Sequence, residues 1–155
     1  MNSIIRKSVP LLLAFSGIYT ACSLKWEKDS YIEYYESKCV SEISQGGFIF
    51  KAMELNPDYE IAKWGSQLDS SYRIVLWVYP RSEGVIRDAF LISKKDTIRP
   101  IAARKTPLFE TGNTDSFSFV FEDKPEKGEI HIKNYNNRLG NVAIATKNCQ
   151  NIRLK

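Results

Sequence analysis

The sequence predicts a mainly β protein, folded as an antiparallel β-sandwich or a small barrel with one or two short helices. About seven short strand-like segments are separated by turn signals, and two segments in the first half of the chain have helical spacing instead. Eight tyrosines, eight phenylalanines and three tryptophans provide a large aromatic area to bury. The 155 residues, 43% of them hydrophobic, therefore suit one globular domain.

The first helix is predicted over residues 31–44. Ser30 and Glu33 have the spacing of a capping box, and apolar residues recur at three- and four-residue intervals after them. The pair Gly46 and Gly47 supplies a stop signal for this helix. An edge strand is the alternative for the segment, because its tyrosines and isoleucine also suit strands.

A second helix and the strands follow from local patterns. Asn56 suits the N-cap of a helix and Pro57 suits its first position. Residues 72–80 are apolar on both faces, which favours a central strand covered on both sides, and Pro100 restricts its own segment to a sheet edge or a bulge. The expected strands, the last two of them a hairpin, are residues 48–55, 72–80, 85–92, 97–103, 116–122, 129–133 and 141–145.

The chain divides into residues 1–21, residues 22–30 and a single mostly-β domain over residues 31–155. We expect these parts to be a signal peptide, a polar tether that carries a lipid, and the folded domain. No internal repeat, low-complexity tract or linker divides the domain further. Its strand pattern is compatible with an immunoglobulin-like sandwich, although the Cys-Trp-Cys spacing typical of that family is not present as such.

Residues 1–21 have the features of an export signal. Arg6 and Lys7 form a positive start, residues 9–19 are mostly apolar, and small residues follow. The apolar run is about half as long as the 20 residues that a membrane-spanning helix requires. We therefore expect a processed signal, with a short interfacial anchor as the less favoured alternative.

The residues around Cys22 resemble the cleavage site of bacterial lipoproteins, in which the signal is cut before a cysteine that carries lipid. Thr20 and Ala21 match that pattern, whereas Tyr19 stands where the family usually has leucine. The resemblance implies a lipid anchor on Cys22 that contains palmitate, and Ser23 after it implies the outer membrane of a bacterial cell envelope. Ordinary secretion, with Cys22 at the boundary by chance, is the alternative.

The chain has three cysteines. If Cys22 carries lipid, Cys39 and Cys149 remain as a pair in an oxidising compartment, and we expect a disulfide between them. A bridge between these cysteines, which are 110 positions apart, would close a long loop and so favour the folded state in the chain-entropy model. Two buried free thiols are the alternative.

Catalytic signals are weak, and we expect no enzyme, no metal and no cofactor. His131 is the only histidine, and its place between two isoleucines favours a surface position on a strand. No second histidine or cysteine motif completes a metal site, and the glycine motifs that present a nucleophile or hold a phosphate are absent. The carboxylate pairs Glu33–Glu36 and Glu122–Asp123 make a carboxylate-dependent hydrolase a less favoured alternative.

Five basic residues gather in one predicted hairpin region. Such residues can contact anionic lipid headgroups, lipopolysaccharide or an acidic partner, or form an ordinary charged face diluted by nearby acids. The net charge of +4 falls to +2 without the leader's Arg6 and Lys7, so it does not indicate a nucleic-acid partner. The five basic residues are Lys94, Lys95, Arg99, Arg104 and Lys105.

Together these features predict a lipid-anchored envelope lipoprotein whose domain has a non-catalytic binding or structural role. Its partners would be the membrane, through the lipid on Cys22, and a protein or small ligand that the sequence does not identify. A carrier that holds a small or lipidic ligand in an apolar interior is the alternative. The domain is expected to face either the periplasm or the cell surface.

Overall fold

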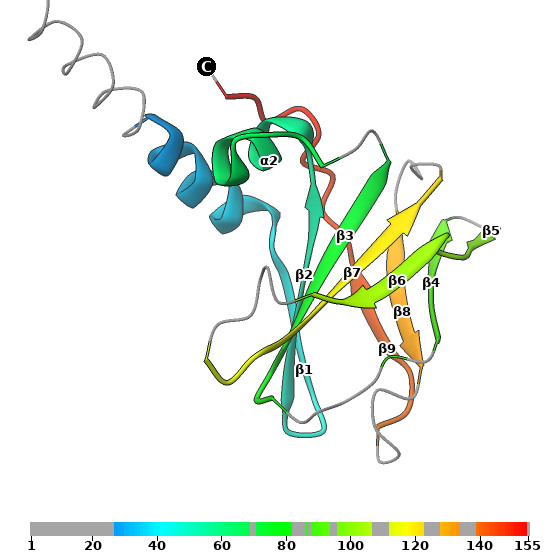
Figure 1. Ribbon diagram of the computed structural model, residues 1–155. Helices are drawn as coiled ribbons and strands as arrows, with labels where there is room; N and C mark the ends of the chain where they lie inside the picture. Colours follow the sequence, from blue (N-terminus) through cyan, green and yellow to red (C-terminus); the bar gives the residue numbers. More distant parts are fainter. Residues whose placement is uncertain are drawn as a thin grey trace, which may run out of the picture.

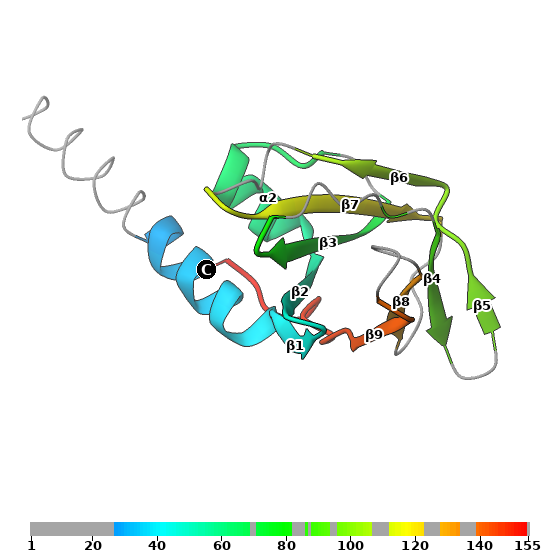
Figure 2. The same ribbon diagram turned by 90° about the horizontal axis from the view of Figure 1, so that it is seen from below.

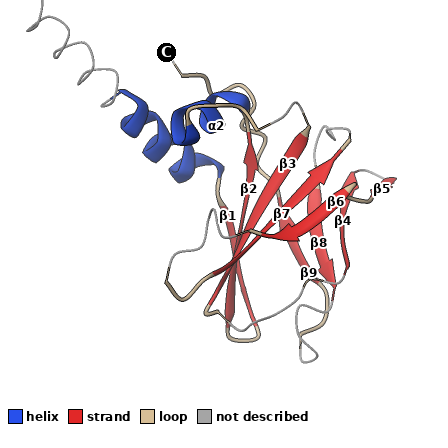
Figure 3. Cartoon of the chain, viewed as in Figure 1, coloured by secondary structure: helices blue, strands red, loops and turns tan. Residues whose placement is uncertain are grey.

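Two antiparallel β-sheets pack against each other in the computed structural model, and two helices lie outside them (Figure 1; Figure 3 marks helices and strands). This architecture confirms the predicted mainly β sandwich, and the sheets are not closed into a barrel. The structure describes residues 27–68, 71–81, 86, 88–93, 96–106, 112–122, 128–133 and 139–154.

The strand order places β3 in the middle of the larger sheet, as its two apolar faces predicted. The five-stranded sheet contains, in spatial order, β1 (Ser41–Gln45), β2 (Phe48–Leu55), β3 (Tyr72–Tyr79), β7 (Asp115–Phe121) and β6 (Ala102–Lys105). The four-stranded sheet contains β5 (Asp96–Ile98), β4 (Asp88–Ser93), β8 (Glu129–Lys133) and β9 (Val142–Ala145). The orders β2–β3–β7–β6 and β5–β4–β8–β9 are those of an immunoglobulin-like sandwich, with β1 added at one edge.

The sandwich core lies between the two sheets. Phe117, Phe119 and Phe121 of β7 point into it, as their alternation with serine predicted. On β3, Ile74 and its alternate neighbours line the same core, while Val75 belongs to a second cluster on the opposite face of the sheet. The sandwich core consists of Phe50, Ala52, Tyr72, Ile74, Leu76, Val78, Ala89, Leu91, Phe117, Phe119, Phe121, Ile130, Ile132, Leu139, Val142 and Ile144.

The prediction of one helix over residues 31–44 is wrong at both ends. The N-terminal helix covers residues 27–39 of the described chain, so it includes residues expected in the tether, and residues 41–45 form β1. Gly46 and Gly47 do not stop a helix but form the two-residue turn between β1 and β2, with φ angles of 59° and 83°. Pairing with β2 outweighs the helical spacing of β1, because the hairpin gives its backbone groups ladder partners.

Pro100 lies where the chain passes from one sheet to the other. It follows β5, the edge of the four-stranded sheet, and precedes β6, the edge of the five-stranded sheet. This position confirms that the proline restricts its surroundings to a sheet edge, but the single strand predicted over residues 97–103 is wrong, because the segment is divided into β5 and β6 of different sheets. The two edges lie on the same side of the sandwich in Figure 2.

Candidate functional site

The N-terminal helix, α2 (Pro57–Trp64) and the C-terminal residues 146–154 pack together on the outer face of the five-stranded sheet. Figure 2 shows the N-terminal helix beside the C-terminal end of the chain. Their buried side chains form a second core, which consists of Tyr31, Tyr35, Cys39, Met53, Leu55, Tyr59, Val75 and Cys149. Because this second core joins the helix nearest the predicted lipid anchor to the sandwich, it is the candidate functional site.

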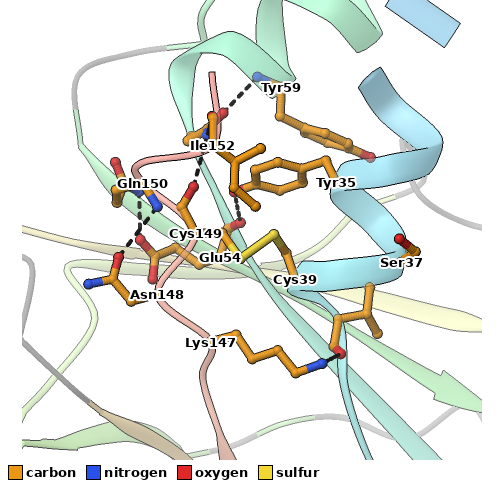
Figure 4. The surroundings of a disulfide bond; sticks show 12 residues. Tyr35, Ser37, Cys39, Glu54, Tyr59, Lys147, Asn148, Cys149, Gln150 and Ile152 are labelled. Atoms are coloured by element: carbon orange, nitrogen blue, oxygen red, sulfur yellow. Dashed lines mark hydrogen bonds between the residues drawn. A yellow bond between two sulfur atoms is a disulfide. The ribbon is translucent and has the colours of Figure 1, made fainter. Parts of the chain in front are cut away.

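The structure brings the predicted cysteine pair together (Figure 4). Cys39 ends the N-terminal helix and Cys149 lies in the C-terminal segment, with Sγ atoms 2.23 Å and Cα atoms 5.9 Å apart. Both residues are buried, and 110 positions separate them in the sequence. The pair therefore links the helix covalently to the segment that follows the last strand. Cys22, the predicted lipid attachment, lies outside the described residues.

Asn56 connects three segments through one buried side chain. As the N-cap of α2, its Oδ1 accepts a hydrogen bond from the backbone N–H of Tyr59 at 2.7 Å, as its position before Pro57 predicted. Its Nδ2 donates to the carbonyl oxygens of Cys149 at 3.2 Å and Ile152 at 2.9 Å. The side chain thus fixes the start of α2 and the path of the C-terminal segment at once.

Tyrosine hydroxyls attach the N-terminal helix to its neighbours. Tyr35 donates to the backbone oxygen of Glu54 in β2 at 2.8 Å, and Tyr31 donates to the backbone oxygen of Ile152 at 3.2 Å. Tyr59 of α2 donates to Glu36 of the N-terminal helix at 2.6 Å. Each hydroxyl bonds a group from a different segment, so the position of the helix is set by directed contacts as well as by packing.

Glu54 is a buried carboxylate at the base of this arrangement. Its two oxygens accept hydrogen bonds from Tyr72 at 3.1 Å and from Nε2 of Gln150 at 2.6 Å (Figure 4 shows the Gln150 contact). Burial, followed by the nearby Glu54 charge, raises the pKa of the hydroxyls of Tyr35 and Tyr72 above the usual value for tyrosine. These tyrosines are therefore neutral donors at physiological pH, which suits a structural network.

A second buried acid ties α2 to the strands. Glu60 lies 3.6 Å from the guanidinium of Arg73, and both side chains are almost completely buried. Its other oxygen accepts a hydrogen bond from the backbone N–H of Leu68 at 3.0 Å. The carboxylate of Glu60 therefore has a buried cationic partner, and this ion pair joins α2 to β3.

The residues considered for catalysis do not converge on one place. His131 lies on the outer face of the four-stranded sheet, where its ring stacks on Phe90 with centroids 5.3 Å apart. Glu36 bonds Tyr59 and pairs with Lys63, while Glu33 and Glu122 are exposed on separate elements and Asp123 lies outside the described residues. Within the described part of the chain, no three histidine, cysteine or acidic side chains are close enough together to hold a metal ion.

The three described residues of the predicted basic cluster do not lie together on one element. Arg99 follows β5 and pairs with Asp88 at 3.0 Å, whereas Arg104 and Lys105 belong to β6 in the other sheet. Since adjacent strand residues point to opposite faces, the side chains of Arg104 and Lys105 diverge, and Lys105 pairs with the buried Asp115. Lys94 and Lys95 lie outside the described residues.

Sequence reasoning found Cys39, Cys149 and the capping role of Asn56, but it missed how the C-terminal segment is held. Residues 146–154 alternate apolar and polar side chains only from residue 151 onward, which is too short a pattern to indicate where the segment lies. Their polar side chains and backbone oxygens nevertheless find partners on β2 and α2, Gln150 among them. An asparagine- and glutamine-containing tail after the last cysteine was the one available hint.

No helix among the residues that the structure describes combines the length and the apolar character needed to cross a membrane. Comparison of the chain with protein-family models, with curated proteins and with solved structures finds no match. Function is therefore inferred from the predicted leader, the second core and the surface of the sandwich.

Proposed function

We propose that this chain is a lipid-anchored lipoprotein of the bacterial cell envelope, attached to the outer membrane through Cys22, whose β-sandwich binds a partner without catalysing a reaction. The observation that carries the proposal is the join between the N-terminal helix and the sandwich. The helix is already formed at Glu27, five positions after Cys22, and it is fixed to the domain by the Cys39–Cys149 pair.

This join limits how far the sandwich can move from a membrane. Five residues span at most about 18 Å when fully extended. The helix over residues 27–39 adds about 20 Å, at 1.5 Å per residue. A lipid on Cys22 would therefore hold Cys39, the residue at which the helix is bonded to the C-terminal segment, within about 40 Å of the headgroups. A helix fixed by a covalent link and buried hydrogen bonds suits a domain presented at a set distance from a surface.

The packed interior favours surface binding over the alternative of a ligand carrier. Large side chains of the sandwich core, including Phe50, Phe119 and Leu91, are fully buried and pack between the described strands of the two sheets. A carrier would need an apolar cavity in that space. The hydrolase alternative has less support still, because Glu36 is engaged by Tyr59 and Lys63 rather than facing a second acid.

Labelling with radioactive palmitate tests the anchor. Wild-type cells should incorporate label into this chain, whereas Cys22→Ala should abolish incorporation and release the protein from the membrane fraction. Ser23→Ala is the matched control, because it changes the adjacent residue and leaves the lipid acceptor in place. Label that persists in Cys22→Ala would refute lipidation at this cysteine.

Protease shaving of intact cells then decides which side of the outer membrane the domain occupies. Removal of the protein, with a periplasmic control protein intact, would place the sandwich on the cell surface. Survival until the outer membrane is opened would place it in the periplasm. The two outcomes direct the search for partners to external proteins or to envelope components.

A further inference from the structure

The two edges of the five-stranded sheet differ in what lies beside them. At one edge, β1 lies next to β9, and Gln45 donates a hydrogen bond to the backbone oxygen of Asn141 at 3.3 Å. Lys147 closes the same side by donating to the backbone oxygen of Val40 at 2.7 Å. At the other edge, no strand of the described chain pairs with the outer side of β6. The described part of this sheet is therefore open at β6.

Backbone groups of β6 point outward from this edge. Thr106 donates its N–H to the oxygen of Ser116 in β7 at 3.0 Å, in the register that also pairs Arg104 with Ser118. Backbone groups alternate in direction along an antiparallel strand, so the N–H and C=O groups of Ala103 and Lys105 are directed away from β7. An extended chain placed alongside β6 would find donors and acceptors at the spacing of a β-ladder.

The side chains of β6 determine which charge is favourable on a strand that pairs with this edge. Ala103, Arg104 and Lys105 are all exposed, and no carboxylate of a described residue pairs with Arg104. Two copies of β6 placed side by side would bring these cations close to each other, which destabilises cross-strand pairs. A segment with acidic side chains would instead place a carboxylate beside Arg104. Ile101, 66% exposed, adds an apolar contact at the start of the edge.

We propose that β6 is the docking edge for an extended acidic segment of a partner protein, which adds to the five-stranded sheet as a further strand and places a carboxylate beside Arg104. This inference rests on the proposed function, because it assigns the partner chemistry of the same non-catalytic binding domain. The preferred segment alternates acidic residues, which face Arg104, with apolar residues on the other face of the new strand.

Fluorescence anisotropy of a labelled peptide tests the docking edge. The probe is a short synthetic peptide in which valine and glutamate alternate, titrated with the full-length chain in detergent. Ala103→Pro removes the outward N–H at a position where the N–H does not face β7, and it should weaken binding about tenfold. Ala103→Val keeps that N–H and is the matched control, which should bind the peptide like the wild type. Unfolding midpoints of both variants verify that the domain is intact.

Charge reversal separates strand addition from simple attraction of charges. Arg104→Glu should weaken the valine–glutamate peptide about fivefold and strengthen the corresponding valine–lysine peptide. Equal affinity of Ala103→Pro and wild type, no binding at millimolar peptide, or self-association through β6 would each overturn the inference. So would binding to anionic vesicles in place of the peptide. Palmitate labelling is measured in a separate experiment. If the wild-type chain incorporates palmitate but does not bind the peptide, the docking edge is refuted and the proposed lipid anchor is not.

Discussion

The sandwich core and the second core are held together by different interactions. The sandwich core consists mainly of aliphatic and phenylalanine side chains on strands that are already paired through their backbones. The second core joins two helices and a tail to the outer face of a sheet, and no β-ladder links these segments. Hydrogen bonds from tyrosine hydroxyls and from the amide of Asn56, together with the Cys39–Cys149 pair, join these segments instead of a β-ladder.

This difference teaches which kind of change each core tolerates. The stability of an apolar core depends on the volume of its side chains, because a smaller side chain loses contacts and leaves a cavity. These packing contacts are not directional. A core that also relies on buried hydrogen bonds depends on each bond, because removing one partner leaves a buried donor or acceptor unsatisfied. We expect damage to the sandwich core to unfold the whole domain, and damage to the second core to release the helix and the tail from a folded sandwich.

The largest expected effect is in the sandwich core. Phe119→Ala should lower the free energy of unfolding by about 3–5 kcal/mol, because a fully buried ring is replaced by a cavity between the sheets. Urea denaturation followed by tryptophan fluorescence measures this change. Tyr79→Ala, at a half-exposed position on the neighbouring strand, is the control and should cost less than about 1 kcal/mol. Equal losses in the two variants would show that the sandwich core is not where stability is concentrated.

Removal of the covalent link should have the next largest effect. The double variant Cys39→Ser, Cys149→Ser should lose about 2–5 kcal/mol, because the unfolded chain regains the freedom that a bridge over 110 positions restricts. Hydrogen exchange read by mass spectrometry locates the loss. Exchange should accelerate more for amides of residues 27–39 than for those of β3, because the released helix opens before the sandwich unfolds. Comparable acceleration in β3 would mean that the two cores unfold as one unit.

The smallest of the three effects concerns Asn56. Asn56→Ala removes the cap of α2 and leaves the carbonyls of Cys149 and Ile152 without the amide donor, which should cost about 2 kcal/mol. Asn56→Ser keeps a capping oxygen but has no amide donor, so it should recover about half of that loss. Thermal unfolding of the wild type and the two variants measures the contribution of the cap and that of the amide hydrogen bonds. A serine variant as stable as the wild type would show that the two carbonyl bonds contribute nothing.

Much of the fold could be predicted because neighbouring residues carry the signals. Strand β2 has the predicted bounds, β3 ends one residue earlier than predicted, and α2 begins at Pro57 as the Asn56–Pro57 pair indicated. The boundary between the N-terminal helix and β1 could not be predicted in the same way. The residues of β1 also fit helical spacing, and only their pairing with β2 across the glycine turn decides the outcome.

The site could be predicted only where chemistry reduces the choices. The expectation that Cys22 carries lipid in an oxidising compartment left Cys39 and Cys149 as a pair, so their bond could be predicted from number and context. Asn56, by contrast, reaches Cys149 and Ile152 across 93 and 96 positions, and no local pattern records such a contact. The separation of Arg99 from Arg104 and Lys105 could not be predicted for a related reason, because β5 and β6 belong to different sheets although they are close in sequence.

The position of the Cys39–Cys149 pair also determines how the molecule would carry a mechanical load. All strands from β1 to β9 lie between the two cysteines in the sequence. Tension that enters through the N-terminal helix therefore passes directly across the sulfur–sulfur bond to the C-terminal segment, and the strands are bypassed. A pull applied between the N-terminal helix and residues 150–154 would load these two segments and leave the β-ladders unloaded.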